Sequence, residues 1–350
     1  MSISRIDQLA IVLVAMPLSA SAHHSIAAFY DYDSPTEIEG TVTSVDWVNP
    51  HIRFTVSTAT PNGDSEEWAM ESGSMNMLAR QGIERGTIEV GDVVTVAGYP
   101  SRHGLNEMIA GYVTAPGGEA VVLWSGLFGG LATSAPPRRT QLRSSGDAAR
   151  AVATASGIYR VWTVGEPYSR DTTDEGGQME VPYRPEALAA RSAYDPLTDD
   201  TALLCIQQGM PGIMDNPFPM EIVDRGDSIE IRLEEWDVVR IVHVNRDHVD
   251  GTQPATAHGY STGQWEDGDL VVSTSDIDWP FFDDIGTPLG DDIHIVERFS
   301  LSDDETRLDY EITVDDPATF AAPFTLDGYW VWAPGEEIKP YNCNLRRDRR

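Results

Sequence analysis

Apolar and polar residues alternate in short runs along the first third of the chain. The run at residues 52–56 (IRFTV) places an apolar side chain at every second position, a period typical of a half-buried strand. The other runs of this kind lie at residues 38–47, 67–71, 93–98 and 108–113. A short helix fits midway between them, with Ser74 as its N-cap and Gly82 as its C-terminal stop. Five strands with one helix predict a small OB-like barrel over residues 23–115.

A second region of alternating runs covers residues 156–345. Its predicted strands lie at residues 157–162, 229–233, 239–244, 264–272, 293–299, 308–314 and 329–332. The fourth of these runs is typical of a hairpin, because Asp267-Gly268 is a preferred pair for a tight turn. The Gly-x-aromatic start of the first run resembles calycin-like barrels, so we predict an antiparallel barrel of the calycin or lipocalin type. The fold class is therefore all-β with few short helices, and residues 116–155 are a linker rich in Pro, Gly, Ser and Ala.

Residues 1–22 have the pattern of a secretory signal peptide. The apolar run at residues 9–18 (LAIVLVAMPL) precedes small residues, and a signal peptidase would cut there, after Ala20 or Ala22. This run is too short to span a bilayer, which takes about 20 residues, and no other segment is predicted to do so. We therefore expect a periplasmic or secreted protein, with an uncleaved N-terminal anchor as the alternative.

The cysteine content agrees with export. The chain has two cysteines, Cys205 and Cys343. Exported proteins rarely leave thiols free, so we predict a disulfide between them; two separate buried thiols are the alternative. The two residues are not in Cys-x-x-Cys spacing, so haem attachment and the thiol chemistry of that motif are not expected.

Charge narrows the set of partners. The chain has 56 acidic and 24 basic residues, of which only Lys339 is a lysine, and its net charge is −32. Nucleic acids and anionic membranes bind basic surfaces, so neither is an expected partner. No Walker loop, dinucleotide-binding glycine pattern, Gly-x-Ser-x-Gly elbow or His-Glu-x-x-His motif occurs, so we expect no nucleotide cofactor.

Several motifs together resemble an uncharacterised family of exported bacterial proteins. In the first region these motifs are residues 22–25 (AHHS), 49–51 (NPH) and 91–96 (GDVVTV). In the second region they are residues 182–185 (PYRP), 263–266 (GQWE), 296–299 (VERF) and 341–343 (YNC). The resemblance covers nearly all of the mature chain and implies an OB-like domain followed by a calycin-like domain, but no activity. This chain departs from the family in its acidity and its near absence of lysine.

Histidines near the expected mature N-terminus predict a metal site. Cleavage after Ala22 makes His23 the first residue, whose free amine and imidazole can chelate one ion, with His24 and His51 as further imidazoles. Cleavage after Ala20 would place His23 third, an arrangement that also binds Cu(II) through backbone nitrogens. Nitrogen ligands favour copper over calcium or magnesium. The alternative is a solvated histidine pair at the terminus and an ordinary loop histidine at position 51.

Three polar residues of the second region fall in phase with apolar neighbours. They are His243, Glu297 and Tyr310, and a period of two predicts that they point into the barrel. A buried carboxylate beside an imidazole is a candidate acid–base pair. The alternative is that Glu297 forms a structural ion pair with Arg240 or Arg298, and that Tyr310 forms a hydrogen bond within the core.

These features support three functions. The first is an exported binding protein with a copper site and a small apolar or amphipathic ligand inside the second barrel. The residues expected around that ligand are Tyr310, Arg240, His258, Trp265, Trp330 and Trp332. The second is a cofactor-independent isomerase, hydratase or lyase that uses the interior acid and base. The third is an envelope scaffold protein.

Overall fold

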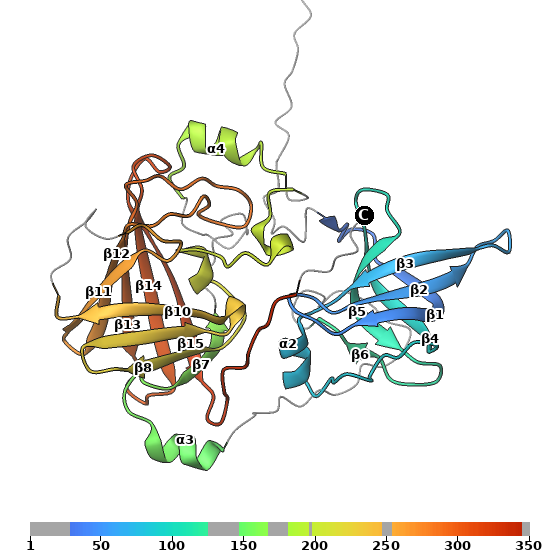
Figure 1. Ribbon diagram of the computed structural model, residues 1–350, viewed down its shortest axis with the longest axis horizontal. Coiled ribbons are helices and arrows are strands. Elements are labelled where there is room, and N and C mark those ends of the chain that lie inside the picture. The colour runs from blue at the N-terminus through green and yellow to red at the C-terminus, as the bar shows by residue number, and fades with distance from the viewer. Residues whose placement is uncertain (1–28, 125–146, 167–180, 196–197, 247–253, 345–350) are drawn as a thin grey trace, which may run out of the picture.

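A computed structural model describes residues 29–124, 147–166, 181–195, 198–246 and 254–344. Over these residues the chain forms two β-barrels that contact each other (Figure 1). The strands of the first barrel are β1 (Thr36–Asp46), β2 (Arg53–Ala59), β3 (Ser65–Glu71), β4 (Val93–Pro100) and β5 (Glu107–Thr114). The strands of the second are β7 (Val161–Glu166), β8 (Met220–Asp224), β9 (Ser228–Leu233), β10 (Val238–Val244), β11 (Tyr260–Glu266), β12 (Asp269–Ser275), β13 (His294–Leu301), β14 (Arg307–Asp315) and β15 (Phe324–Trp332). The predicted all-β fold of two barrels is confirmed.

The first barrel closes through a parallel pairing of its third and fifth strands. The sheet order is β3-β2-β1-β4-β5, and residues 69–71 of β3 pair with residues 107–109 of β5. Strand β6 (Val121–Val122) adds to the outer edge of β5. Helix α2 (Met75–Arg80) lies midway, as predicted. The Ser74 hydroxyl accepts the Met77 N–H at 3.1 Å, and Gly82 follows the helix with a φ of +74°.

The second barrel is antiparallel except at one seam. The nine described strands close in the order β10-β11-β12-β13-β14-β15-β7-β8-β9. Residues 242–244 of β10 pair in parallel with residues 261–263 of β11. The predicted hairpin is present between β11 and β12, with positive φ at both Asp267 and Gly268.

Short helices lie outside the strands. They are α3 (Ala148–Thr154), α4 (Pro185–Arg191) and three 3₁₀ turns, η1 (Thr201–Leu204), η2 (Gly212–Met214) and η3 (Glu235–Asp237). Helix α3 falls within the predicted linker, where an alanine-rich sequence follows the Asp147 N-cap. Within the described ranges, no helix is long and apolar enough to cross a membrane.

Candidate functional site

A buried ion pair occupies the interior of the second barrel. Arg240 on β10 donates to both carboxylate oxygens of Glu297 on β13, at 2.9 and 2.6 Å. Tyr310 on β14 donates its hydroxyl to Oε1 of the same carboxylate at 2.8 Å. The three residues are 2%, 0% and 1% exposed, respectively. Glu297 is therefore the acceptor of a bidentate, charge-assisted pair, and the ion pair with Arg240 that the sequence offered as the alternative is present.

His243 lies on the opposite face of the barrel wall. The inner face of β10 carries Arg240 with a buried valine on either side, whereas Val239 and Ile241 on the outer face are 50% and 40% exposed. His243 shares that outer face and stacks on Tyr260, with 4.9 Å between ring centroids. The prediction that His243 points inward is wrong, because apolar residues occupy both faces of β10 and do not mark the inner one. The interior acid–base pair of the enzyme hypothesis is therefore not formed.

The tryptophans predicted to surround a ligand are spread through the second barrel. Trp330 is 6% exposed and packs within the core. Trp332 lies under the guanidinium of Arg160, 4.3 Å from the ring centroid. Trp265 is 43% exposed beside the hairpin that joins β11 to β12, and its ring centroid lies 6.4 Å from that of Tyr159. The structure does not bring the three indoles together around one ligand.

His258 lies near the inner ion pair. Its ring nitrogen Nε2 donates to the carbonyl oxygen of Gln208 at 3.1 Å. Burial lowers the pKa of His258; the hydrogen bond to Gln208 opposes this shift, and the positive charge of Arg240 adds to it. His258 is therefore neutral in the folded protein at a pH where an exposed imidazole would already be protonated.

Replacing His258 with glutamine should flatten the dependence of stability on acid pH. In the unfolded chain the imidazole protonates near its ordinary pKa of 6.5. In the folded chain it protonates only at lower pH, so the unfolded state binds more protons in this window and stability falls as the pH drops. Glutamine keeps a donor for Gln208 and removes the titration. The measurement is the free energy of unfolding in urea at pH 7.5 and pH 5, for the wild type and the variant. If the difference between the two pH values were the same in both proteins, the prediction would be wrong.

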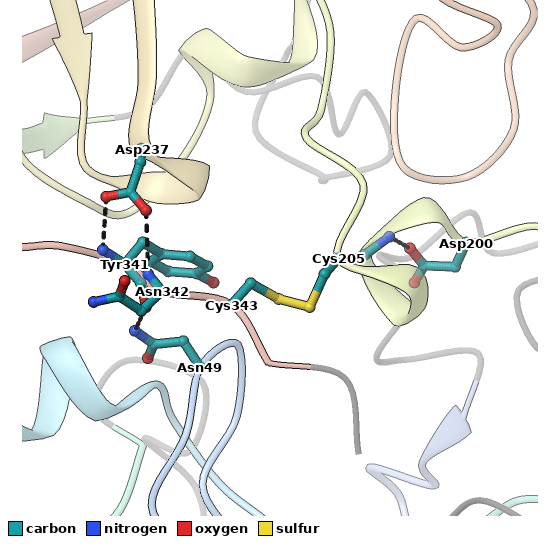
Figure 2. Close-up of a disulfide and its surroundings, with 8 residues drawn as sticks. Asn49, Asp200, Cys205, Asp237, Tyr341, Asn342 and Cys343 are labelled. Carbon is teal, nitrogen blue, oxygen red and sulfur yellow. Dashed lines mark hydrogen bonds between the residues drawn. A yellow bond between two sulfur atoms is a disulfide. The ribbon is translucent and has the colours of Figure 1, made fainter. Parts of the chain in front are cut away.

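The predicted disulfide is present. Cys205 follows η1 and Cys343 lies close to the end of the described chain, and the bond joins positions 138 residues apart (Figure 2). Asp200 caps η1 by accepting the Ala202 N–H at 2.9 Å. The bond therefore ties the C-terminal segment to the body of the second barrel.

Asn49 of the Asn-Pro-His bend joins the two barrels. Its side chain is fully buried and donates to the carbonyl oxygen of Tyr341 and, at 3.3 Å, to the side chain of Asn76. Its Oδ1 accepts the Met75 N–H at 2.9 Å, and its carbonyl oxygen accepts the Asn344 N–H at 3.0 Å. In the sequence, the Asn-Pro-His motif stood out because of its histidine. In the structure, Asn49 makes more hydrogen bonds than His51 does.

A second buried group of charges completes the contact between the barrels. Glu234 at the end of β9 is fully buried and accepts hydrogen bonds from Arg80 of α2 to both of its oxygens, one at 2.6 Å. It also accepts from Asn76 at 3.0 Å and from the Lys339 backbone at 2.8 Å. Arg80 donates further to Glu336 at 3.0 Å. Burial alone would lower the pKa of Arg80, but the two carboxylates raise it. No sequence pattern indicated this group.

His51 lies half-buried on the first barrel. Its Nδ1 is 3.0 Å from the carbonyl oxygen of Ser72, so this nitrogen carries the proton and donates. Its Nε2 lies 3.6 Å from Oε1 of Glu71, and the ring stacks on Trp124 with 5.3 Å between centroids. The other oxygen of Glu71 accepts from Arg53 at 2.7 Å. His51 and Glu71 are thus two side chains that could bind one metal ion.

The remaining predicted ligands, His23 and His24, lie outside the described residues. In the part of the chain that is described, no group of three or more His, Cys, Asp or Glu side chains is arranged to hold a metal ion.

Comparison with known proteins supports only the N-terminal part of the predicted resemblance. A model of a family of unknown function, DUF6152, matches residues 10–110. This range covers most of the first barrel and includes Asn49-Pro50-His51, so the resemblance to an uncharacterised family holds there. No curated protein and no solved structure matches the chain.

Proposed function

We propose that this protein is an exported, non-enzymatic binding protein whose OB-like first barrel binds a Cu(II) ion at His51. The observation that carries the proposal is the hydrogen bond from Nδ1 of His51 to the Ser72 carbonyl oxygen. Metal-binding histidines generally donate their second ring nitrogen to a carbonyl or carboxylate, which orients the ring and leaves the other nitrogen as the ligand. In His51 that other nitrogen is Nε2, on the side of Glu71.

The spacing of His51 and Glu71 suits a shared ion. Ligand bonds of about 2.0–2.1 Å allow two donors roughly 3–4 Å apart to hold one metal, and the two side chains lie 3.6 Å apart. Among divalent first-row metals, Cu(II) binds nitrogen and oxygen donors most tightly. Stacking on Trp124 fixes the plane of the ring, so less side-chain freedom is lost when the ion binds.

The mature N-terminus would complete the coordination. His23 or His24 would supply further nitrogen donors after export and signal cleavage. Tyr30, near the start of the described chain, packs in the same small aromatic cluster as Trp124. His24 precedes Tyr30 by six residues, which span up to about 20 Å when extended. This proximity supports a shared site.

The geometry of the second barrel favours binding over the enzyme hypothesis. It needed Glu297 as a free acid beside His243, but Glu297 is bound to Arg240 and His243 faces outward. No contact among the described residues points to an envelope scaffold. Binding therefore remains the best supported function.

Replacing His51 with alanine should weaken Cu(II) binding at least about 10–100-fold, since even indirect partners of a metal ligand contribute that much. The measurement is calorimetric titration with Cu(II) of mature protein with its N-terminus verified by sequencing, together with the nitrogen hyperfine pattern in electron paramagnetic resonance. The variant Glu71→Gln should weaken binding to a smaller extent.

The matched control is His243→Ala, which removes an imidazole from the outer face of the second barrel and should leave the titration unchanged. A tag placed ahead of His23 should abolish the contribution of the terminal amine. If the mature protein did not bind Cu(II) at submicromolar concentration, the proposal would be wrong. It would also be wrong if the wild type and the His51→Ala variant bound Cu(II) equally well.

A further inference from the structure

The C-terminal segment at residues 339–344, called the latch here, lies against both barrels. In Figure 1 it is the red segment that runs from the second barrel past α2. On the second barrel, Asp237 accepts the backbone N–H groups of Tyr341 and Asn342 at 2.8 and 3.2 Å. On the first barrel, Asn49 binds the Tyr341 carbonyl oxygen and the Asn344 N–H. The latch therefore bridges the two barrels through its own backbone groups, which form hydrogen bonds with Asp237 and Asn49 (Figure 2).

One covalent bond secures the far end of this bridge. Cys343 lies within the latch, next to Asn342 and Asn344, and its partner Cys205 belongs to the second barrel. With the bond intact, the backbone that contacts Asn49 stays beside the second barrel. Without it, only non-covalent contacts would hold the latch: the hydrogen bonds to Asp237 and Asn49, the bond from the Lys339 N–H to Glu234, and the packing of Tyr341.

The backbone around the disulfide is under strain. Among the described residues, eight non-glycine residues have positive φ, and four belong to this region: Cys205, Trp236, Asp237 and Asn342, at 53°, 61°, 55° and 49°. Such conformations persist only where surrounding contacts enforce them, and they cluster at switch regions. Asparagine and aspartate tolerate this conformation, so the strain falls on Cys205 and Trp236, and loss of the covalent bond would allow Cys205 to relax, which favours release.

The disulfide is also accessible from solvent. Both cysteines are half-buried, and Leu204 and Ile206 on either side of Cys205 are 54% and 44% exposed. Asn342 and Asn344 on either side of Cys343 are exposed as well. The bond therefore lies at the surface of the second barrel's core, against which both cysteines pack.

We propose that the Cys205–Cys343 disulfide is a redox switch that controls the docking of the two barrels. A dithiol reductant attacks one sulfur, forms a mixed disulfide and then closes its own disulfide. Two electrons and two protons pass from the dithiol to the protein, which is left with two cysteine thiols. The latch then leaves Asn49, water reaches the buried polar groups between the barrels, and the barrels move apart. A disulfide-bearing oxidant that takes the two electrons and two protons back by the same exchange re-forms the bond and restores the docked form.

The test compares oxidised and reduced protein under native conditions, with dithiothreitol as the dithiol. We expect the radius of gyration from X-ray scattering to rise on reduction. We also expect amide exchange in residues 75–80 and 339–344 to speed up at least about tenfold, as in local opening, while the strands of both barrels remain protected. A Cys205→Ser, Cys343→Ser protein should show the open behaviour with or without reductant.

A further variant tests the latch without touching the disulfide. Asn49→Ala should open α2 to exchange in the oxidised protein, whereas Asn106→Ala, an exposed asparagine of the same barrel, should not. Unchanged scattering and exchange in the reduced protein would overturn the proposal. Loss of protection throughout the strands of the second barrel would also overturn it, because the disulfide would then maintain the fold and not control docking.

Discussion

The variant Glu297→Gln should lose about 3–5 kcal/mol of unfolding free energy, because it leaves the guanidinium of Arg240 buried without its counter-ion. The side chains of this pair are 0% and 1% exposed, so water cannot replace the missing charge. For a domain of this size the melting temperature should fall by about 10 °C. The measurement is urea and thermal unfolding followed by circular dichroism.

Glu266→Gln is the matched control. Glu266 pairs with Arg298 on the outer face of the same barrel at 2.8 Å, but its side chain is 41% exposed, and exposed pairs contribute about 0–1 kcal/mol. A second variant, Arg240→Met with Glu297→Leu, should recover most of the loss, since replacing both charges leaves neither one unpaired. If Glu297→Gln proved as stable as the wild type, the pair would not be structural and a chemical role for Glu297 would return.

The barrel strands were predictable because their signals are local. In the first barrel the alternation at residues 52–56 faces one core, and Ser74 and Gly82 bound a helix through their own backbone preferences. The Asp267-Gly268 turn likewise needs only the positive φ values that these two residues tolerate. None of these features depends on a residue far away in the sequence.

The inner face of β10 was not predictable in the same way. Valine and isoleucine occupy both faces of this strand, so the pattern of apolar residues does not show which face points into the barrel. Arg240 points inward because Glu297 on β13 is there to receive it, a partner 57 residues later in the chain. The sequence did suggest Arg240 as a possible partner of Glu297, but only the barrel closure decides between Arg240 and Arg298.

The role of Asn49 depends on a still longer contact. Its partner Tyr341 lies 292 residues away, and an asparagine before proline in a sequence is equally typical of an ordinary turn. The disulfide was predictable from the cysteine count and the expected export, but its effect on the first barrel was not. That effect follows only from the position of Cys343 in the segment that Asn49 contacts.

Arg80→Met should uncouple the two barrels, so that a single unfolding transition becomes two. Glu234 would remain fully buried and keep only neutral donors from Asn76 and Lys339. Breaking a buried pair by removing one partner costs about 3–5 kcal/mol. A buried carboxylate that has lost its hydrogen-bonded cation avoids much of this cost if the barrels separate and admit water. The measurement is calorimetric unfolding together with amide exchange in α2.

Arg85→Met is the matched control, because Arg85 is exposed on the first barrel and donates only to the Trp47 carbonyl oxygen among its described contacts, at 3.2 Å. Adding Glu234→Gln to Arg80→Met should restore part of the coupling, since the buried group is then neutral and still accepts from Asn76. The double-mutant cycle over these two residues measures their interaction directly. A near-zero interaction energy would mean that the barrels dock through the apolar contact of Met77 and the latch, and that the buried charges add only specificity.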